Sequence, residues 1–402
     1  MTRIARGLAG VAVTETRLSE VDGEAGRLTI AGFELESLAP RADFEQTLFL
    51  LWHDRLPDRE ELTDLKRSLA ERRRLPAPTL SVLRAAAAMG AEPMDALRMG
   101  AATLGLADDA LHRSGLQAEP AEANRSRALR FVAALPVIVA AYHRLRDGLE
   151  PVPPDRRLDH AANYLWMITA VRPTPERSRA LATYLNATSD HGMNASTFTA
   201  RVIASTRSCL ASALVGALGA LKGPLHGGAP GPVLDMLFEL LRLAQDEGGS
   251  LEEVTEGWVR RQVSRGARIM GFGHRIYRVR DPRADVLGAA LATLSPEPER
   301  QEFLRAARLV EEVVLRVLAE EKPGRPLHTN VEFYTALLLH GLGLEASLFT
   351  PTFAVARVAG WTAHVLEQIA EDRLIRPTVV YAGARGRCFP SPDAHGGARE
   401  VA

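Results

Sequence analysis

Residues Ala128–Leu145 have the sequence ALRFVAALPVIVAAYHRL, in which apolar side chains recur three and four positions apart. This spacing is the period of an α-helix that packs one apolar face against a core. The same period predicts further helices at Phe44–His53, Arg59–Arg73, Leu80–Met89 and His160–Val171. The sequence therefore predicts a mainly α fold.

A strand pattern is found only near the start of the chain. Leu28, Ile30 and Phe33 lie beside Gly26 and Gly32, which predicts a small β-hairpin. Elsewhere, prolines and glycines separate helices of ordinary length, and no internal repeat is present.

The net charge of the 402 residues is +0, with 49 basic and 49 acidic side chains. A neutral chain lacks the electrostatic footprint of a protein that binds nucleic acid or an anionic membrane. The apolar runs Phe131–Tyr142 and Leu210–Leu221 are too short to cross a bilayer, and Pro136 interrupts the first. All but three basic residues are arginines, which bind carboxylates and phosphates bidentately.

Two cysteines, Cys209 and Cys388, exclude a disulfide framework and a four-thiolate metal site. Residues Met1–Val13 contain too short an apolar stretch for a signal peptide. We therefore expect a cytoplasmic protein.

A helix predicted from Ser205 to Leu221 carries small residues on several faces, among them Ser212, Gly216 and Gly219. Small residues allow two helices to approach closely. The approach is either internal packing or the subunit interface of a helical homodimer.

Three breaks in the helical pattern carry residues suited to chemistry. The first is Gly223–Gly228, GPLHGG, where glycines on both sides of His226 permit close approach of a ligand. His226 is either functional or a turn residue, and no partner at metal-ligand spacing accompanies it. Lys222 has the side chain needed to form a Schiff base. The alternative is that it is a solvent-facing lysine at the end of a helix.

The second break is Arg268–Arg283, RIMGFGHRIYRVRDPR, with five arginines and a histidine around a Gly-x-Gly turn. This density of arginine indicates a site for phosphates or carboxylates. The third is His328–Tyr334, HTNVEFY, in which Asn330 is a candidate helix cap. Glu332 then falls in the first helical turn, either as a capping carboxylate or as a functional one.

Together these segments resemble the citrate synthase family. GPLHGG, GFGHRIYR with the following DPR, and NVEFY occur in that family's order and at its spacing. SDHGMNAS at Ser189–Ser196 resembles the family's oxaloacetate-site segment. The likeness extends to both ends of the chain, in the segments Arg6–Gly32, Phe349–Arg357, Gly360–His364 and Leu374–Pro377.

The resemblance implies a multi-helical homodimer. Each subunit would have a large domain, formed by residues 1–226 and 341–402, and a small mobile domain of residues 227–340 that closes over the substrates. The implied reaction is the acyltransferase step of the tricarboxylic acid cycle, in which acetyl-CoA and oxaloacetate condense to citrate and CoA. Acetyl-CoA would be a co-substrate, and no metal or other cofactor is expected.

Site residues are implied position by position. His226 resembles the donor that stabilises the thioester enol, His274 the group that polarises the ketone, and Glu332 occupies the position of the catalytic base. Oxaloacetate would contact His191, Arg283 and Arg357 of one subunit. The partner subunit would contribute its Arg376 to the same site. CoA would lie against the backbone of Gly271, Phe272 and Gly273, with its phosphates near Arg268, Arg278 or Arg280.

Glu332 departs from the family pattern, which has aspartate at this position. The added methylene extends the carboxylate by about 1 Å, and a misplacement of that size costs roughly 100-fold in rate. Three functions remain open on the sequence alone. They are a citrate synthase, a 2-methylcitrate synthase that uses propionyl-CoA, and a catalytically weak paralogue retained for ligand binding.

Overall fold

The computed structural model describes residues 4–8, 10–107, 120–227, 230–294, 298–324 and 327–387. The chain divides into two compact units. One unit, Thr16–Leu374, contains all of the described α-helices and strands. The other is formed by the two ends of the chain, up to Glu15 and from Ile375, and includes the short 3-10 helix η1, Arg6–Leu8.

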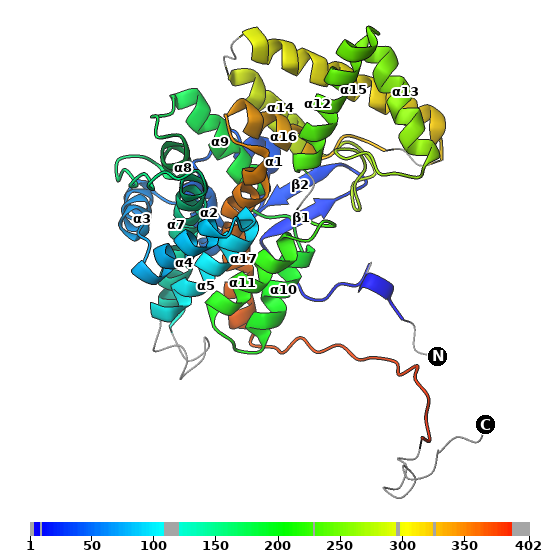
Figure 1. Ribbon diagram of the computed structural model, residues 1–402. Coiled ribbons are helices and arrows are strands. Elements are labelled where there is room, and N and C mark those ends of the chain that lie inside the picture. The colour runs from blue at the N-terminus through cyan, green and yellow to red at the C-terminus, as the bar shows by residue number, and fades with distance from the viewer. Residues whose placement is uncertain are drawn as a thin grey trace, which may run out of the picture. The chain divides into compact units, whose positions relative to one another are not determined.

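The unit Thr16–Leu374 is built mainly from α-helices, which confirms the predicted fold class (Figure 1). The helices of its first half are α1 Leu35–Leu38, α2 Phe44–His53, α3 Arg59–Arg72, α4 Ala77–Ala88, α5 Pro93–Leu104, α7 Ala121–Arg146, α8 His160–Thr169 and α9 Pro175–Thr188. Those of its second half are α10 Ala195–Ser205, α11 Leu210–Leu221, α12 Pro230–Glu247, α13 Leu251–Ser264, α14 Pro282–Thr293, α15 Pro298–Glu321, α16 Val331–Gly341 and α17 Phe349–Glu371. Two short 3-10 helices are η2 Gly105–Ala107 and η4 Ala346–Leu348.

A small antiparallel sheet has three strands in the order β1 Ser19–Asp22, β2 Arg27–Ile30 and β3 Phe33–Glu34. The predicted hairpin corresponds to β2 and β3, which turn at Ala31 and Gly32, both with positive φ. Strand β1 was not predicted, because its sequence SEVD lacks an apolar alternation and pairs with β2 through the backbone.

Helix α17 is the central element of the core. It packs against α2, α7, α9, α10 and α11 (Figure 1), and most of its residues are buried. Helix α7 runs without a break through Pro136, as the helical period of Ala128–Leu145 predicts, and it is longer than the apolar run Phe131–Tyr142. By length and composition α7 is the one helix among the described residues suited to cross a membrane, but 78% of its apolar window is buried inside the unit. Burial against α3, α4, α5, α8 and α17 makes it a core helix.

The helices between residues 230 and 341 pack mainly on one another. Helix α13 lies against α12 and α15, and α16 lies against α12 and α14. Figure 1 shows α12, α13 and α15 gathered at the end of the unit away from α3, α4 and α5. Helix α14 also contacts α9 and α1, and therefore joins this group to the earlier helices.

The helix predicted from Ser205 to Leu221 begins later, as α11 at Leu210, because Ser205 is the last residue of α10. Arg207 takes a left-handed conformation between them, with φ of 63°, although neither glycine nor proline marks the break. The small residues serve internal packing on one face, since a Cβ on Gly216 would lie 2.3 Å from Ile203 Cδ1 of α10. Ser212 and Gly219 remain exposed on another face.

Candidate active site

Six segments that are distant in the sequence surround one cavity of about 250 Å³ within the unit Thr16–Leu374. They are the loop after α9, the turn after α11, the loop Arg268–Ile276, and the starts of α14, α16 and α17. The cavity is lined by predicted site residues from all of these segments: His191, His226, Arg268, Gly271, Phe272, Gly273, His274, Arg283, Glu332 and Arg357.

The glycine turn is fixed against the segment that precedes α16. Gly271 and Gly273 have φ of 87° and 82°, a left-handed backbone that favours glycine. The amide of Gly273 donates to the carbonyl of His328 at 2.7 Å, and the side-chain amide of Asn330 donates to the carbonyl of Gly273 at 2.8 Å. These bonds hold the loop that carries His274 beside the helix that carries Glu332.

Glu332 lies in the first turn of α16, where Asn330 caps the helix by accepting from the Glu332 amide at 2.9 Å. Its Oε2 is shielded from solvent and accepts no hydrogen bond from the described residues. Burial raises the pKa of Glu332 to about 7, although the positive charges of Arg283 and Arg357 act to lower it. The carboxylate is therefore a base with a pKa near neutrality that faces the cavity.

The hydrogen bonds of His274 determine which of its nitrogens donates. Its Nδ1 accepts from the backbone amides of Ile276 and Tyr277, both at 3.1 Å. Burial, aided by the charge of Arg283, lowers the pKa of His274 to about 4, so the ring is neutral at pH 7. A neutral imidazole with Nδ1 as acceptor carries its proton on Nε2.

His226 has the opposite arrangement. Its Nε2 accepts from the amide of Ser196 at 3.3 Å and lies 2.8 Å from the Ser196 hydroxyl. Trp361 Nε1 donates to that same hydroxyl at 3.0 Å, which fixes its position. Burial and the charge of Arg357 lower the pKa of His226 to about 4. The ring is therefore neutral and carries its proton on Nδ1, for which no described residue is a hydrogen-bond partner.

Two of the arginines that line the cavity, Arg283 and Arg357, are almost completely buried. Arg283 Nε and Nη2 donate to the carboxylate of Asp281 at 3.0 and 2.7 Å. Asp281 also accepts from the amide of Val331 at 3.2 Å, so it ties α14 to α16. Arg357 Nε donates to the carbonyl of Thr188 at 2.6 Å.

His191 lies next to these cations. Its Nε2 is 3.2 Å from the Tyr277 hydroxyl, and its ring meets that of His274 edge to face. Burial, followed by the charges of Arg283 and Arg357, holds the pKa of His191 well below its ordinary value, so this ring is neutral as well.

The remaining predicted residues lie elsewhere. Arg278 does not line the cavity; its side chain is exposed, with Nε 3.9 Å from a Glu24 carboxylate oxygen. Arg376 belongs to the terminal unit and is exposed. Lys222 forms an exposed ion pair with Asp95 at 2.6 Å, which agrees with the helix-end alternative. Cys388 and Gly228 lie outside the described residues.

The known proteins that are similar to this chain point to one family. The family model described as "Citrate synthase, C-terminal domain" matches residues 7–378. The citrate synthase of Haloferax volcanii is 40% identical over 96% of this chain and 98% of its own length.

The chain belongs to the citrate synthase family.

A second relative, the 2-methylcitrate synthase of Mycobacterium tuberculosis, is 37% identical over 96% of the chain and 92% of its own length. Among solved structures, the citrate synthase of Thermoplasma acidophilum in ternary complex with carboxymethyl-CoA and oxaloacetate has a TM-score of 0.84. It is 26% identical and matches 98% of this chain and 100% of its own. The family therefore carries out citrate synthase-type condensation, which is an acyl transfer in which the acyl group becomes an alkyl group.

Sequence reasoning did not identify the residues that hold the site together. Asp281, Ser196 and Tyr277 lie inside the motifs that were singled out, but no role was inferred for them. An aspartate directly before a proline that begins a helix is a recognisable cap signal, and Asp281 does accept from the Arg283 amide at 3.0 Å.

Proposed function

We propose that this chain condenses acetyl-CoA with oxaloacetate to give citrate and CoA, with Glu332, His226 and His274 as the catalytic residues. The observation that carries the proposal is a carboxylate oxygen that accepts no hydrogen bond within the described part of the chain and shares a cavity with two neutral histidines. Two buried arginines line the same cavity.

The first step would be enolisation of acetyl-CoA. A thioester methyl group is a weak acid, so removal of its proton needs a base and a donor on the carbonyl oxygen together. Glu332, with its pKa near 7, would take the methyl proton. His226 Nδ1–H would donate to the thioester oxygen, and the backbone amide of Ser196 on Nε2 keeps that proton on Nδ1.

The second step would join the two substrates. Arg283 and Arg357 would bind the oxaloacetate carboxylates beside His191, and His274 Nε2–H would polarise the ketone. The enol carbon attacks the ketone carbon and a carbon–carbon bond forms, while the ketone oxygen takes a proton and becomes a hydroxyl. Water then cleaves the citryl thioester to citrate and free CoA.

The CoA moiety would lie over the loop Gly271–Gly273, which lines the cavity with Phe272 between two glycines and with Arg268 nearby in the chain. Arg278, outside the cavity, would meet a CoA phosphate only beyond its mouth. We propose further that residues 227–340 form a small domain, which closes against the large domain of residues 1–226 and 341–402 and excludes water.

The functional enzyme would be a homodimer in the cytoplasm. The terminal segment would bring Arg376 of the partner subunit to the oxaloacetate site. The exposed small residues of α11, Ser212 and Gly219, offer a face for close approach of a second copy. Acid–base chemistry and hydrogen bonding suffice for every step, so the proposal requires neither a metal nor another cofactor.

Release of CoA thiol from the purified protein tests this function. With oxaloacetate and acetyl-CoA we expect steady turnover, and with propionyl-CoA a lower kcat/KM. A preference for propionyl-CoA would replace the proposal with 2-methylcitrate synthesis. Absence of thiol release with both substrates, from protein that still binds oxaloacetate, would leave a ligand-binding paralogue.

A further inference from the structure

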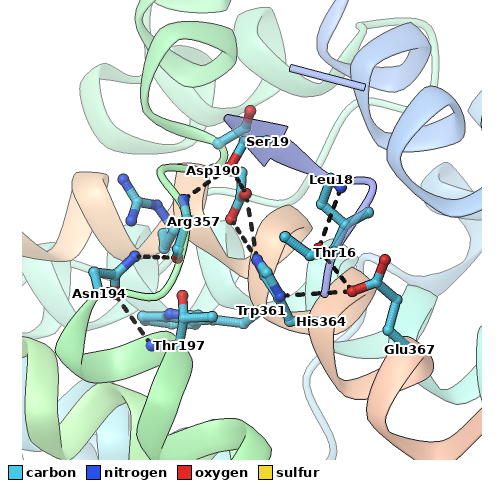
Figure 2. Close-up of polar contacts among 12 residues, drawn as sticks. Thr16, Leu18, Ser19, Asp190, Asn194, Thr197, Arg357, Trp361, His364 and Glu367 are labelled. Carbon is cyan, nitrogen blue, oxygen red and sulfur yellow. Dashed lines mark hydrogen bonds and ion pairs between the residues drawn. The ribbon is translucent and has the colours of Figure 1, made fainter. Parts of the chain in front are cut away.

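The loop that carries His191 is fixed from behind by a set of buried polar side chains outside the cavity. Asp190 and His364 are completely buried, and Arg201 is 1% exposed. His364 Nε2 lies 3.2 and 3.3 Å from the two carboxylate oxygens of Asp190. Figure 2 shows Asp190 between Ser19 of β1 and His364 of α17. None of the proposed chemical steps uses these groups.

The partners of His364 determine its protonation. Arg201 Nη1 lies 3.2 Å from His364 Nδ1, and a guanidinium only donates hydrogen bonds. Nδ1 is therefore the acceptor, and the proton of the ring is on Nε2, which points at Asp190. Arg201, on α10, itself donates to two side chains of α17, the helix that carries His364. Its Nε donates to Gln368 at 2.9 Å and its Nη1 to Glu367 at 3.0 Å. The ring is thus fixed on one side by Arg201 and donates to Asp190 on the other.

A second element holds the same loop. The Ser19 hydroxyl donates to Asp190 Oδ2 at 2.5 Å and accepts from the amide of Gly192 at 2.8 Å. Asp190 and Gly192 are the two neighbours of His191 in the chain. Ser19 therefore bridges both sides of the residue whose ring lines the cavity.

The backbone of α17 also touches this loop directly. The amide of Gly360 donates to the carbonyl of Ser189 at 3.2 Å. A Cβ on Gly360 would lie 2.3 Å from that carbonyl oxygen and 2.6 Å from Asp190 Oδ1. The distance between helix and loop thus depends on a glycine at this position.

We propose that Asp190, His364 and Ser19 are positioning residues that set His191 for oxaloacetate. The inference deepens the proposed function and rests on the role of His191 as an oxaloacetate ligand. The carboxylate of Asp190 accepts from both partners, and this fixes the backbone on either side of His191. Without one partner the buried carboxylate shifts toward the other, and the ring of His191 moves with its backbone.

Oxaloacetate binding to the full-length protein, measured by calorimetry without CoA, tests the proposal. In His364→Leu the donor to Asp190 is lost, and we expect the Kd to rise about 10- to 100-fold, the value of one hydrogen bond to a charged ligand. The KM for oxaloacetate should rise equally, while the KM for acetyl-CoA and the kcat at saturation change less than about threefold. His364→Gln keeps a donor near the position of Nε2 and should restore the affinity.

Two further variants separate positioning from stability. Ser19→Ala removes the other partner of Asp190 at a half-buried position and should raise the oxaloacetate Kd in the same way, even where His364→Leu fails to fold. Thr362→Val is the matched control, because Thr362 is completely buried on the same helix and bonds Trp52 at 3.2 Å instead of the loop. It should lower the unfolding midpoint and leave the Kd unchanged.

His191→Ala distinguishes the two ways in which the proposal fails. If His191→Ala binds oxaloacetate as the wild type does, the proposed role of His191 is wrong, and the inference fails with it. If His191→Ala weakens binding but Ser19→Ala does not, only the positioning role is overturned. An equal loss of affinity in Thr362→Val would likewise refute it, since general destabilisation would then explain the effect.

Discussion

Replacing Glu332 by glutamine should destroy activity and stabilise the fold at the same time. Glu332 Oε2 is shielded from solvent and has no hydrogen-bond partner among the residues that the structure describes, and burial raises the pKa of the carboxyl group from its ordinary 4.5 to about 7. Ionisation of this group therefore costs free energy in the folded chain that it does not cost in the unfolded chain. Glu332→Gln removes that cost.

The size of the effect follows from the two pKa values. A change from 4.5 to about 7 corresponds to about 3 kcal/mol of unfolding free energy at 1.36 kcal/mol per pH unit. The folded state holds its proton more tightly than the unfolded state does. The contribution of Glu332 to the stability of the wild type therefore falls as the pH rises from about 4 to about 7 and is constant above that pH.

The assay is thermal or urea unfolding of both proteins at equal concentration between pH 5 and pH 8.5. For a chain of 402 residues, about 3 kcal/mol corresponds to about 4 °C in Tm. We expect Glu332→Gln to be more stable by about that amount at pH 8 and by less than about 1 kcal/mol at pH 5. Glu60→Gln is the control, because it removes a carboxylate that lies exposed on α3 instead of a buried one.

Loss of the base should lower kcat by about 10²- to 10⁴-fold in the same variant. If Glu332→Gln loses activity but is no more stable than the wild type at pH 8, the ionised carboxylate of Glu332 does not destabilise the folded state. That result would refute the reasoning. A variant with unchanged kcat would remove Glu332 from the chemistry altogether.

Four other variants test single contacts. His274→Ala should lower kcat by about 10²-fold or more with an intact fold by circular dichroism, and wild-type turnover would exclude His274 as the electrophile. Glu332→Asp retracts the carboxylate by about 1 Å to the length usual in the family and should raise kcat, by up to about 100-fold; unchanged activity would show that the longer side chain does not limit the site. Arg357→Leu should raise the oxaloacetate KM at least tenfold while the acetyl-CoA KM stays constant, and a change confined to acetyl-CoA would reassign the residue. Asp281→Asn leaves Arg283 without its buried anion and should destabilise the fold by about 3–5 kcal/mol in urea, so an unchanged midpoint would argue against that pairing.

Local sequence rules predicted much of the fold. The period of apolar residues gave the bounds of α2 as observed, and Asn330 caps α16 as its residue type suggests. The rules failed where tertiary contacts decide. Arg207 breaks α10 from α11, although neither glycine nor proline marks the end of the helix.

The sequence could predict a site residue only where a reactive side chain lies within a recognisable local motif. His226, His274 and Glu332 each lie in a break of the helical pattern, and the structure brings all three to one cavity. The contacts behind them join residues far apart in the chain, as Asp190 and His364 do. No local period or spacing encodes such a pair, because the fold alone makes them neighbours.

The most direct test of the account follows the fate of acetyl-CoA labelled with ¹³C at the methyl carbon. Wild-type protein with oxaloacetate should form labelled citrate and free CoA in equal amounts, as measured by NMR and thiol titration. Glu332→Gln should form both at least about 100-fold more slowly. Citrate formation at the wild-type rate by Glu332→Gln, or thiol release without labelled citrate, would contradict the proposal that Glu332 generates the enol that attacks oxaloacetate.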